Sequence, residues 1–250
     1  YNVIGIDNFL TGKKEKLPNS HYKNFKFIFG DANKKKNINQ IFKSYKIKFV
    51  FHFSAVVGVQ RTLKHPLKVM DDIYGVKNLL DLSVKYKVKR FFYSSSSEVY
   101  GEPITLPLHE EKSPFNSKLP YSIVKNVSEN YVKIFYEKFN LNYTIFSFFN
   151  TFGPNQSEDF VIPKFVKLAL KNKDIPIFGD GQQTRTFIYI DDNIETIIKC
   201  FEKNIYINDV LNIGSNKEYN ILNLAKKIIK LTNSSSEIKF LPALSRGDMR

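Results

Sequence analysis

A tyrosine and a lysine four residues apart form the pattern in this sequence that most suggests chemistry. Tyr121 and Lys125 stand in a stretch with helical periodicity, in which residues four apart share one face of the helix. An ammonium beside a phenol lowers the pKa of the phenol, and the phenolate can then take a proton from an alcohol or sugar hydroxyl. A second pair at this spacing, Tyr22 and Lys26, precedes an apolar run in a polar stretch, so the surroundings of each pair must decide.

The surroundings of Tyr121 include a run of serines that ends an apolar stretch earlier in the chain. If this stretch is an extended strand, Ser94, Ser96 and Glu98 point to the same side. A serine hydroxyl there can share the substrate proton with Tyr121. The alternative interpretation is a serine-rich turn, which we assign to residues 234–236 because they follow a helix in polar surroundings.

The elements that must position these residues alternate between strands and helices along residues 1–152. The sequence predicts strands at 3–6, 25–29, 49–53, 90–95 and 143–148, with helices at 69–86 and 121–139. One apolar face of the second helix is formed by Val124, Val127, Tyr131, Ile134 and Phe135. This alternation predicts βαβ units and an α/β fold with a parallel sheet covered on both faces, in which ligands gather at the carboxyl ends of the strands.

A second, smaller domain is expected from residue 153 to residue 250. It contains predicted helices at 162–170, 194–201 and 221–231 and predicted strands at 186–190 and 210–213. We expect this domain to cap the first one, and part of it, such as residues 187–192, to pack back on the first domain.

The composition excludes several classes of protein. Hydrophobic residues make up 42% and charged residues 25%, which excludes a wholly disordered chain. The single cysteine, Cys200, cannot form an internal disulfide, and the four histidines lack metal-ligand spacing, so no metal site is expected. No signal segment or bilayer-spanning stretch is visible, so a cytoplasmic protein is expected.

The net charge of +14 raises the possibility of nucleic-acid binding. The basic residues are mostly lysines spread along the chain, without the interleaved aromatic residues that stack on bases. A solvated, lysine-rich surface is therefore the favoured interpretation. Because only five residues are arginines, each arginine is informative, since bidentate phosphate recognition needs a guanidinium group.

Asp7 ends the first predicted strand. In dinucleotide-binding folds a carboxylate here binds the adenosine ribose, and the glycine-rich phosphate loop lies about 20 residues earlier. That loop would precede residue 1, so we expect the first strand, the loop and most of the first helix to be missing from this sequence. The alternative is an aspartate that only forms a turn.

Taken in order along the chain, these motifs resemble the extended short-chain dehydrogenase/reductase family, in its nucleotide-sugar epimerase, dehydratase and decarboxylase branch. The matching segments are Gly5-Ile6-Asp7-Asn8, Gly30-Asp31, His52-Phe53-Ser54-Ala55, 94–101, 121–125, 149–154, Val161-Ile162-Pro163, 178–185, Tyr189-Ile190-Asp191-Asp192, Asn212-Ile213-Gly214 and Arg246-Gly247-Asp248. The resemblance, closest in kind to UDP-glucose 4-epimerases, implies a Rossmann-type doubly wound sheet with a smaller substrate-binding domain.

The resemblance also implies a cofactor and roles for individual residues. NAD is the implied cofactor, and Tyr121 is the implied base, with Lys125 and Ser96 as its catalytic partners. The implied cofactor-binding residues are Asp7, Asn8, Asp31, Ala32, Phe53, Ser54, Ser94, Tyr121, Lys125 and Phe148. The implied substrate-binding residues are Ser96, Asn150, Val161, Arg185, Phe187 and Arg246. The implied partners are a nucleoside-diphosphate sugar and a second copy of the chain in a homodimer, with no nucleic acid or membrane.

Some positions depart from the family pattern. Asp72 replaces the usual asparagine, Ser147 replaces a frequent arginine, Ser54 replaces an alanine, and Arg246 is displaced by one residue. The segment before Val99 also ends in Glu98, which many 4-epimerases of the family lack. A buried carboxyl there could act as a second acid or base, but the alternative is that Glu98 only caps a backbone amide.

The resemblance implies oxidation of a nucleotide sugar at C4, with the phenolate of Tyr121 taking the hydroxyl proton and NAD taking the hydride. Return of the hydride to the opposite face makes the enzyme a 4-epimerase, which is our first choice. Loss of water makes it a 4,6-dehydratase, and loss of carboxylate makes it a glucuronate decarboxylase, the two outcomes that Glu98 favours. The alternative of another class is a non-catalytic dinucleotide-binding regulatory protein on the same fold.

Overall fold

The computed structural model describes residues 1–18, 22–102 and 104–243, which divide into two compact units. The first unit joins residues 1–148 to 203–212, and the second joins 149–202 to the chain from 213 onward. The boundary between the two units lies between residues 148 and 149, a few residues before the expected boundary between 152 and 153. The segment that returns to the first unit is 203–212, whereas we expected 187–192, because strand β10 (Asp209–Ile213) lies beside strand β5 (Tyr143–Phe148).

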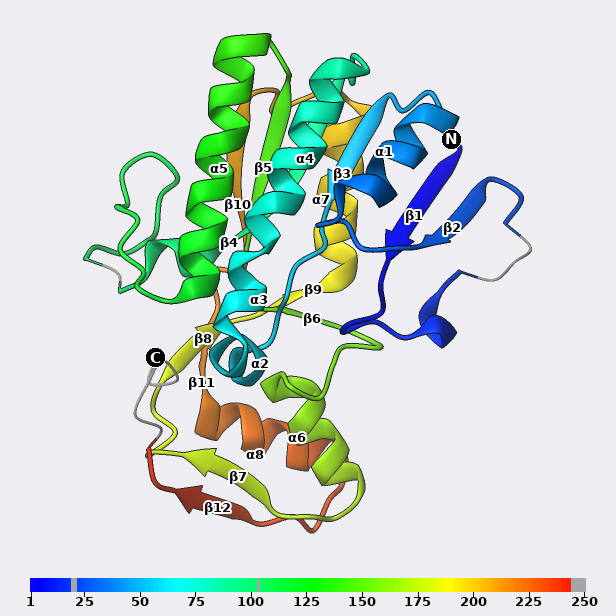
Figure 1. Ribbon diagram of the computed structural model, residues 1–250. Coiled ribbons are helices and arrows are strands. Elements are labelled where there is room, and N and C mark those ends of the chain that lie inside the picture. The colour runs from blue at the N-terminus through cyan, green and yellow to red at the C-terminus, as the bar shows by residue number, and fades with distance from the viewer. Residues whose placement is uncertain (19–21, 103, 244–250) are drawn as a thin grey trace. The chain divides into compact units, whose positions relative to one another are not determined.

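A four-stranded sheet in the order β10-β5-β4-β3 forms the centre of the first unit (Figure 1). Strand β4 (Arg90–Ser96) runs parallel to both β3 (Phe49–His52) and β5. The aromatic side chains of β4 are almost completely buried, as expected for the middle of a parallel sheet. Strands β1 (Val3–Asp7) and β2 (Phe25–Phe29) form a separate parallel pair. The predicted α/β class with a parallel sheet is therefore confirmed.

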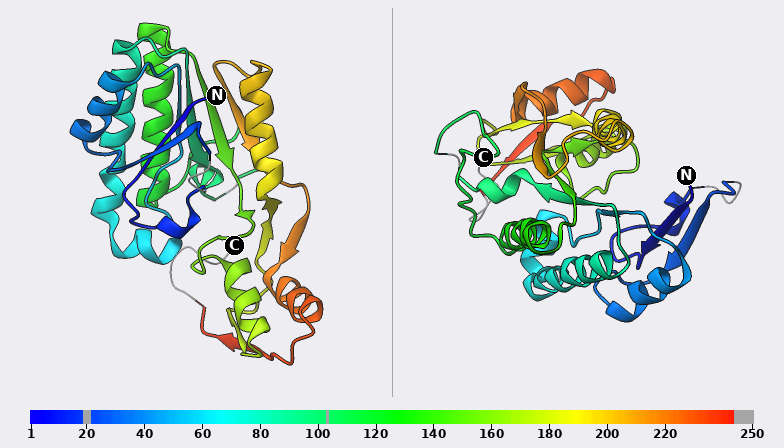
Figure 2. Two further views of the ribbon diagram at one scale, coloured as in Figure 1. Left: turned by 90° about the vertical axis from the view of Figure 1, so that its right-hand side faces the viewer. Right: turned by 90° about the horizontal axis from the view of Figure 1, so that it is seen from above.

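Three long helices of the first unit lie together along one face of this sheet (Figure 2). They are α1 (Lys35–Ser44), α4 (Asp72–Lys85) and α5 (Pro120–Phe139). The core between the helices and the sheet contains Leu80, Phe91 and Val132, each with no exposed surface. The short helices of the unit are η1 (Lys14–Lys16), α2 (Val59–Lys64), α3 (Pro66–Met70) and η2 (Ser97–Tyr100).

Helix α5 carries the predicted tyrosine and lysine, and its limits follow from its sequence. Pro120 occupies the first turn, where a missing N–H has no cost, and Asn140 ends the helix in the left-handed conformation with φ of 53°. The predicted apolar face is only partly buried. Val124 and Phe135 pack into the core, whereas Val127 and Ile134 are exposed, because the core faces a narrower stripe of the helix.

The second unit is built around two helices and a parallel pair of strands. Helices α6 (Val161–Leu170) and α8 (Ile221–Leu231) pack on β7 (Ile175–Phe178) and β12 (Ile238–Leu241) through a separate apolar core. Two smaller strand pairs are β8 (Thr184–Thr186) with β11 (Glu218–Asn220), and β6 (Thr151–Phe152) with β9 (Ile188–Tyr189). Helix α7 (Ile190–Glu202) follows β9 directly.

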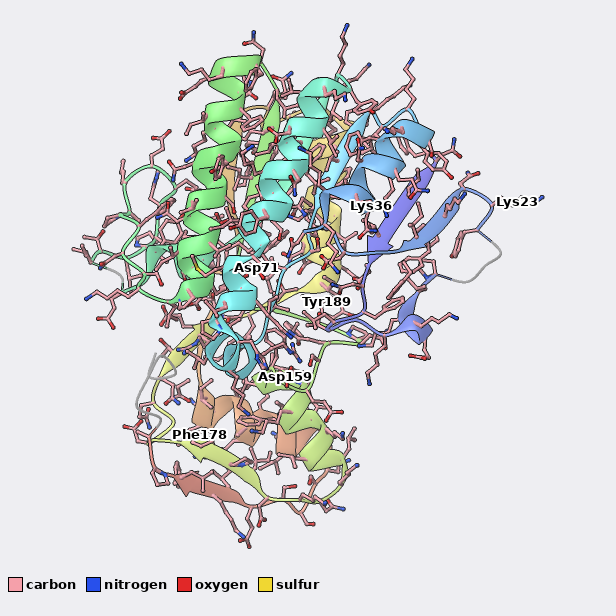
Figure 3. The ribbon with its side chains drawn as sticks, in the orientation of Figure 1. Lys23, Lys36, Asp71, Asp159, Phe178 and Tyr189 are labelled. Carbon is pink, nitrogen blue, oxygen red and sulfur yellow. The ribbon has the colours of Figure 1, made fainter. Side chains whose placement is uncertain are left out.

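Three predicted elements differ from the structure. The helix predicted over 69–86 is two helices, α3 from Pro66 and α4 from Asp72, with the exposed Asp71 between them (Figure 3). The strand predicted over 186–190 is divided between β8 and β9, which pair with different strands. Tyr189 is the last residue of β9 (Figure 3), and α7 begins at the next residue, earlier than predicted.

Candidate active site

The serine-rich end of β4 lies against helix α5, within the first unit. Tyr121, Lys125 and Glu129 are each four residues apart on α5, so they share one face of the helix and lie toward this strand end. Three contacts join residues 94–96 of β4 to α5: Ser96 with Tyr121, the carbonyl oxygen of Ser94 with Lys125, and Ser95 with Glu129. The structure thus brings together the three residues expected to catalyse the reaction, Ser96, Tyr121 and Lys125.

Tyr121 has a higher pKa than the sequence suggested. Burial raises the pKa of the phenol to about 12, and the nearby carboxylate of Glu98 acts in the same direction. The Ser96 hydroxyl, which is hydrogen-bonded to the phenol, favours the phenolate but does not offset burial. The expectation that Lys125 lowers this pKa is therefore wrong for the protein alone: the Lys125 Nζ lies 5.7 Å from the centre of the Tyr121 ring, and burial dominates.

Lys125 is a buried ammonium with few partners. Its Nζ donates a hydrogen bond of 2.6 Å to the Ser94 carbonyl oxygen and lies 4.9 Å from the centre of the Tyr93 ring. Burial lowers the pKa of Lys125 to about 8, while the carboxylates of Asp72 and Glu129 oppose this shift. An ammonium has three N–H donors, and among the described residues only one of them is hydrogen-bonded. The remaining donors are available to hydroxyl groups of a ligand.

Glu98 does not lie where an extended strand would have placed it. The chain leaves the extended conformation after Ser96 and forms the short helix η2, in which the Glu98 backbone N–H donates to Ser96 Oγ at 3.3 Å. The expectation of a buried carboxyl on the same side as Ser96 is therefore wrong, since the Glu98 side chain is exposed. Its carboxylate still acts on Tyr121, so Glu98 belongs to the surroundings of the phenol.

Asp72 and His52 are buried polar groups near Lys125 for which the sequence assigned no role. Asp72 accepts hydrogen bonds from the Val56 backbone N–H at 2.8 Å and from Asn33 Nδ2 at 2.9 Å. Burial raises the pKa of Asp72 and lowers the pKa of His52 to about 3. The sequence signals were the departure from the family asparagine at position 72 and the place of His52 at the start of the matching segment 52–55.

The expected cofactor-binding residues of the first unit follow the carboxyl ends of its strands. Asp7 ends β1, Asp31 follows β2, Phe53 and Ser54 follow β3, and Phe148 ends β5; Asn8 and Ala32 are the neighbours of the two aspartates. The exposed Asp7 carboxylate accepts a hydrogen bond of 2.6 Å from the Phe9 backbone N–H. Its unused acceptor capacity and the free donors of Lys125 fit the hydroxyl groups of a dinucleotide.

The expected substrate-binding residues that the structure describes, other than Ser96, lie in the second unit. Asn150 donates its side-chain amide to the Thr186 carbonyl oxygen at 3.1 Å, and Arg185 Nη1 donates to Thr184 O at 2.8 Å. Val161 begins α6, and Phe187 packs against the apolar core of this unit. Arg246 lies outside the described residues.

A cavity of about 680 Å³ is present in the second unit. Its lining combines aromatic rings with polar groups: Phe152, Phe187, Ile188, Tyr189, Asp192, Gly214, Ser215 and Asn216. Of the residues expected to bind substrate, this lining contains Phe187 alone, so the structure gathers Asn150, Val161 and Arg185 in the same unit without placing them around this cavity.

Within the described residues, no group of three or more histidine, cysteine, aspartate or glutamate side chains is placed to hold a metal ion. In the same part of the chain, no helix combines the length and the apolar composition needed to cross a bilayer.

Comparison with protein families shows which family the chain belongs to. Residues 1–214 match the family described as NAD dependent epimerase/dehydratase. The chain belongs to this family. It is therefore an NAD-dependent enzyme of the nucleotide-sugar epimerase and dehydratase group, as the sequence motifs indicated.

Individual members of the group that resemble the chain have different activities. A dTDP-D-glucose 4,6-dehydratase of Bos taurus is 32% identical over 96% of this chain and 68% of its own length. A UDP-N-acetyl-alpha-D-glucosaminuronate decarboxylase of Bacillus cytotoxicus is 32% identical over 96% of this chain and 75% of its own. The crystal structure of a UDP-glucose 4-epimerase with UDP-glucose from Thermotoga maritima superposes with a TM-score of 0.93, at 30% identity, covering 100% of this chain and 80% of that one.

Proposed function

We propose that this chain oxidises the C4 hydroxyl of a nucleoside-diphosphate sugar and acts as a 4-epimerase through a 4-keto intermediate. The observation that supports this proposal is the cluster of Ser96, Tyr121 and Lys125 at the carboxyl end of the central strand β4. This cluster contains an acid or base (Tyr121), a cation (Lys125) and a hydroxyl that orients a substrate oxygen (Ser96). Proton transfer from a sugar hydroxyl requires these three groups.

Tyr121 acts as the acid and base of the reaction. With a pKa of about 12, only about one phenol in 10⁵ is ionised at pH 7, so the phenolate needs stabilising before it can accept the C4 hydroxyl proton. Ser96 donates to the phenolic oxygen, and the Lys125 ammonium lies on the face of the same ring. Bound NAD supplies the hydride acceptor for C4 and a positively charged ring that favours the phenolate.

The residues that we propose to hold NAD are those at the strand ends of the first unit. Asp7 accepts hydrogen bonds from the adenosine ribose, and its negative charge disfavours the 2′-phosphate of NADP. Asp31 and Ala32 would flank adenine, and Phe53, Ser54 and Phe148 would line the rest of the cofactor site. Lys125 donates its free N–H groups to the nicotinamide ribose. We propose Asn150, Val161, Arg185, Phe187 and Arg246 for the nucleotide diphosphate and its base.

A second candidate outcome, dehydration or decarboxylation, is favoured by Glu98. Its exposed carboxylate acts electrostatically on the Tyr121 phenol, and we propose that it exchanges a proton with the substrate in these reactions. A 4-epimerase needs no such group, because hydride leaves and returns at C4.

Product analysis separates these outcomes. The NAD-loaded enzyme is incubated with UDP-glucose, TDP-glucose, GDP-mannose and UDP-glucuronate, and the products are identified by NMR. A C4 epimer as the sole product, formed equally well by Glu98→Gln, supports the 4-epimerase and removes Glu98 from the mechanism. A 4-keto-6-deoxy or decarboxylated sugar that disappears in Glu98→Gln refutes the 4-epimerase and supports the second candidate.

We also propose that the enzyme is a cytoplasmic homodimer that associates through α5. Ile123, Val127 and Ile134 leave apolar surface exposed along this helix, with exposed fractions of 40%, 37% and 48%. Sedimentation velocity on the wild type and on Val127→Glu tests the association. A dimer that Val127→Glu converts to a monomer supports it, and a monomeric wild type refutes it.

A further inference from the structure

Glu129 is a buried acid that the proposed reaction does not use. Its side chain has no exposed surface, and its Oε1 accepts a hydrogen bond from Ser95 Oγ. Its Oε2 has no hydrogen-bond partner within the described part of the chain, and Lys133 Nζ lies 4.0 Å from this oxygen. Burial accordingly raises the pKa of the Glu129 carboxyl. A carboxyl in such surroundings lowers the stability of the fold, because its single hydrogen bond offsets the loss of water only in part.

The end of β4 needs support that the sheet does not provide. Strand β3 accompanies β4 only as far as the pair of His52 with Tyr93, whereas β5 continues to the pair of Phe148 with Ser96. Residues 94–96 therefore have a neighbouring strand on one side only. On that side the residue paired with Ser95 is Ser147, but the Ser95 hydroxyl donates to Glu129. The side chain of Ser95 is held by α5 instead.

The three contacts of residues 94–96 with α5 depend on one another because all of them join the same short strand end to the same helix. A small slide of the strand end along the helix therefore breaks all three contacts, since hydrogen bonds tolerate only a few tenths of an ångström. Of the three, the Ser95–Glu129 contact alone involves no residue of the proposed chemistry.

We propose that Glu129 is a positioning residue, whose hydrogen bond with Ser95 holds the end of β4 in register on α5. This register places the Ser96 hydroxyl against Tyr121 and the Ser94 carbonyl oxygen against Lys125. The inference rests on the proposed function, because those two contacts serve the proton transfer. Glu129 therefore affects turnover by holding Ser95, without contact with the substrate.

Steady-state kinetics of the NAD-loaded enzyme on its best nucleotide sugar test the proposal. Glu129→Leu keeps an apolar side chain of similar size but removes the acceptor, and kcat is expected to fall by about 10- to 100-fold with KM little changed. Glu129→Gln keeps an acceptor oxygen in place and is expected to retain most of kcat. Ser95→Ala removes the same hydrogen bond without a large change in volume. If Glu129→Leu does not fold, the kcat of Ser95→Ala tests the proposal in its place.

The double variant and a surface control make the result specific. Because both substitutions remove one contact, Ser95→Ala with Glu129→Leu should lose no more kcat than either alone. Lys133→Met removes the 4.0 Å cation and should leave kcat unchanged. The proposal is overturned if Glu129→Gln is as impaired as Glu129→Leu, if the losses add, or if Ser95→Ala keeps its full kcat.

Hydrogen exchange separates this proposal from the proposed function. Backbone amides of residues 94–98 should exchange faster in Glu129→Leu and Ser95→Ala than in the wild type or in Glu129→Gln, with the rest of β4 unchanged. This measurement needs no substrate. A wild type that turns over no nucleotide sugar refutes the proposed function alone, whereas unchanged exchange at 94–98 in both variants refutes the role of Glu129.

Discussion

Replacing His52 with phenylalanine should remove an acid sensitivity that this side chain gives to the first unit. His52 ends β3 with only 4% of its surface exposed, and its Nδ1 lies 3.3 Å from Ser54 Oγ. The rings of Phe91 and Tyr93 have their centres 6.3 Å and 5.9 Å from the imidazole. Burial lowers the pKa of His52 to about 3, and the Lys125 ammonium acts in the same direction.

The size of the effect follows from the pKa values in the folded and unfolded states. The folded protein keeps His52 neutral down to about pH 3, whereas the unfolded chain protonates it below its ordinary value of 6.5. Between these values the unfolded state binds more protons, so the free energy of unfolding decreases as the pH falls. At pH 5 the decrease is about 2 kcal/mol, because each pH unit below 6.5 contributes about 1.36 kcal/mol.

Urea unfolding of the wild type and of His52→Phe at pH 7 and at pH 5 measures this effect. Any packing change caused by phenylalanine is present at both pH values. The free energy of unfolding of the variant relative to the wild type should therefore rise by about 2 kcal/mol from pH 7 to pH 5. The control is His65→Gln, since His65 is exposed to water in the folded protein. An unchanged difference between His52→Phe and the wild type at the two pH values would refute the burial of a neutral imidazole.

Three further substitutions test other parts of the structure. Tyr121→Phe should lower kcat by a factor of about 10² or more with the fold intact, measured as steady-state turnover beside far-UV circular dichroism; near-normal turnover would exclude Tyr121 as the base. Arg185→Lys should raise KM for the nucleotide sugar, because an ammonium cannot form a bidentate pair with a diphosphate, and calorimetric affinity equal to the wild type would contradict this. Arg90→Met should lower the free energy of unfolding by about 3 kcal/mol. The reason is that the buried Arg90 donates to the carbonyl oxygens of Ile205 and Tyr206 at 2.6 Å and 2.9 Å. A urea midpoint of Arg90→Met equal to that of the wild type would refute this contribution to stability.

Local patterns in the sequence were enough to predict the class of fold and the centre of the candidate site. Hydrophobic periodicity depends on neighbouring residues, so the strands of the first unit and helix α5 were found within a residue or so of their limits. The spacing of Tyr121 and Lys125 required them to share a helix face, and the serine run ended a buried strand as predicted. The family motifs then indicated the cofactor, which the family match confirms.

Other features were decided only by tertiary structure. The backbone turn after Ser96 determined the position of Glu98, and no periodicity in the sequence marks that turn. The pKa of Tyr121 rises because folding removes water from the phenol, an effect that outweighs a nearby ammonium and cannot be judged from spacing. The contacts of Arg90 with residues 204–206 and of Ser95 with Glu129 join positions far apart in the chain. Burial and long-range contacts arise only when separate elements pack, and for that reason the sequence could name the candidate catalytic residues but not the groups that pack around them.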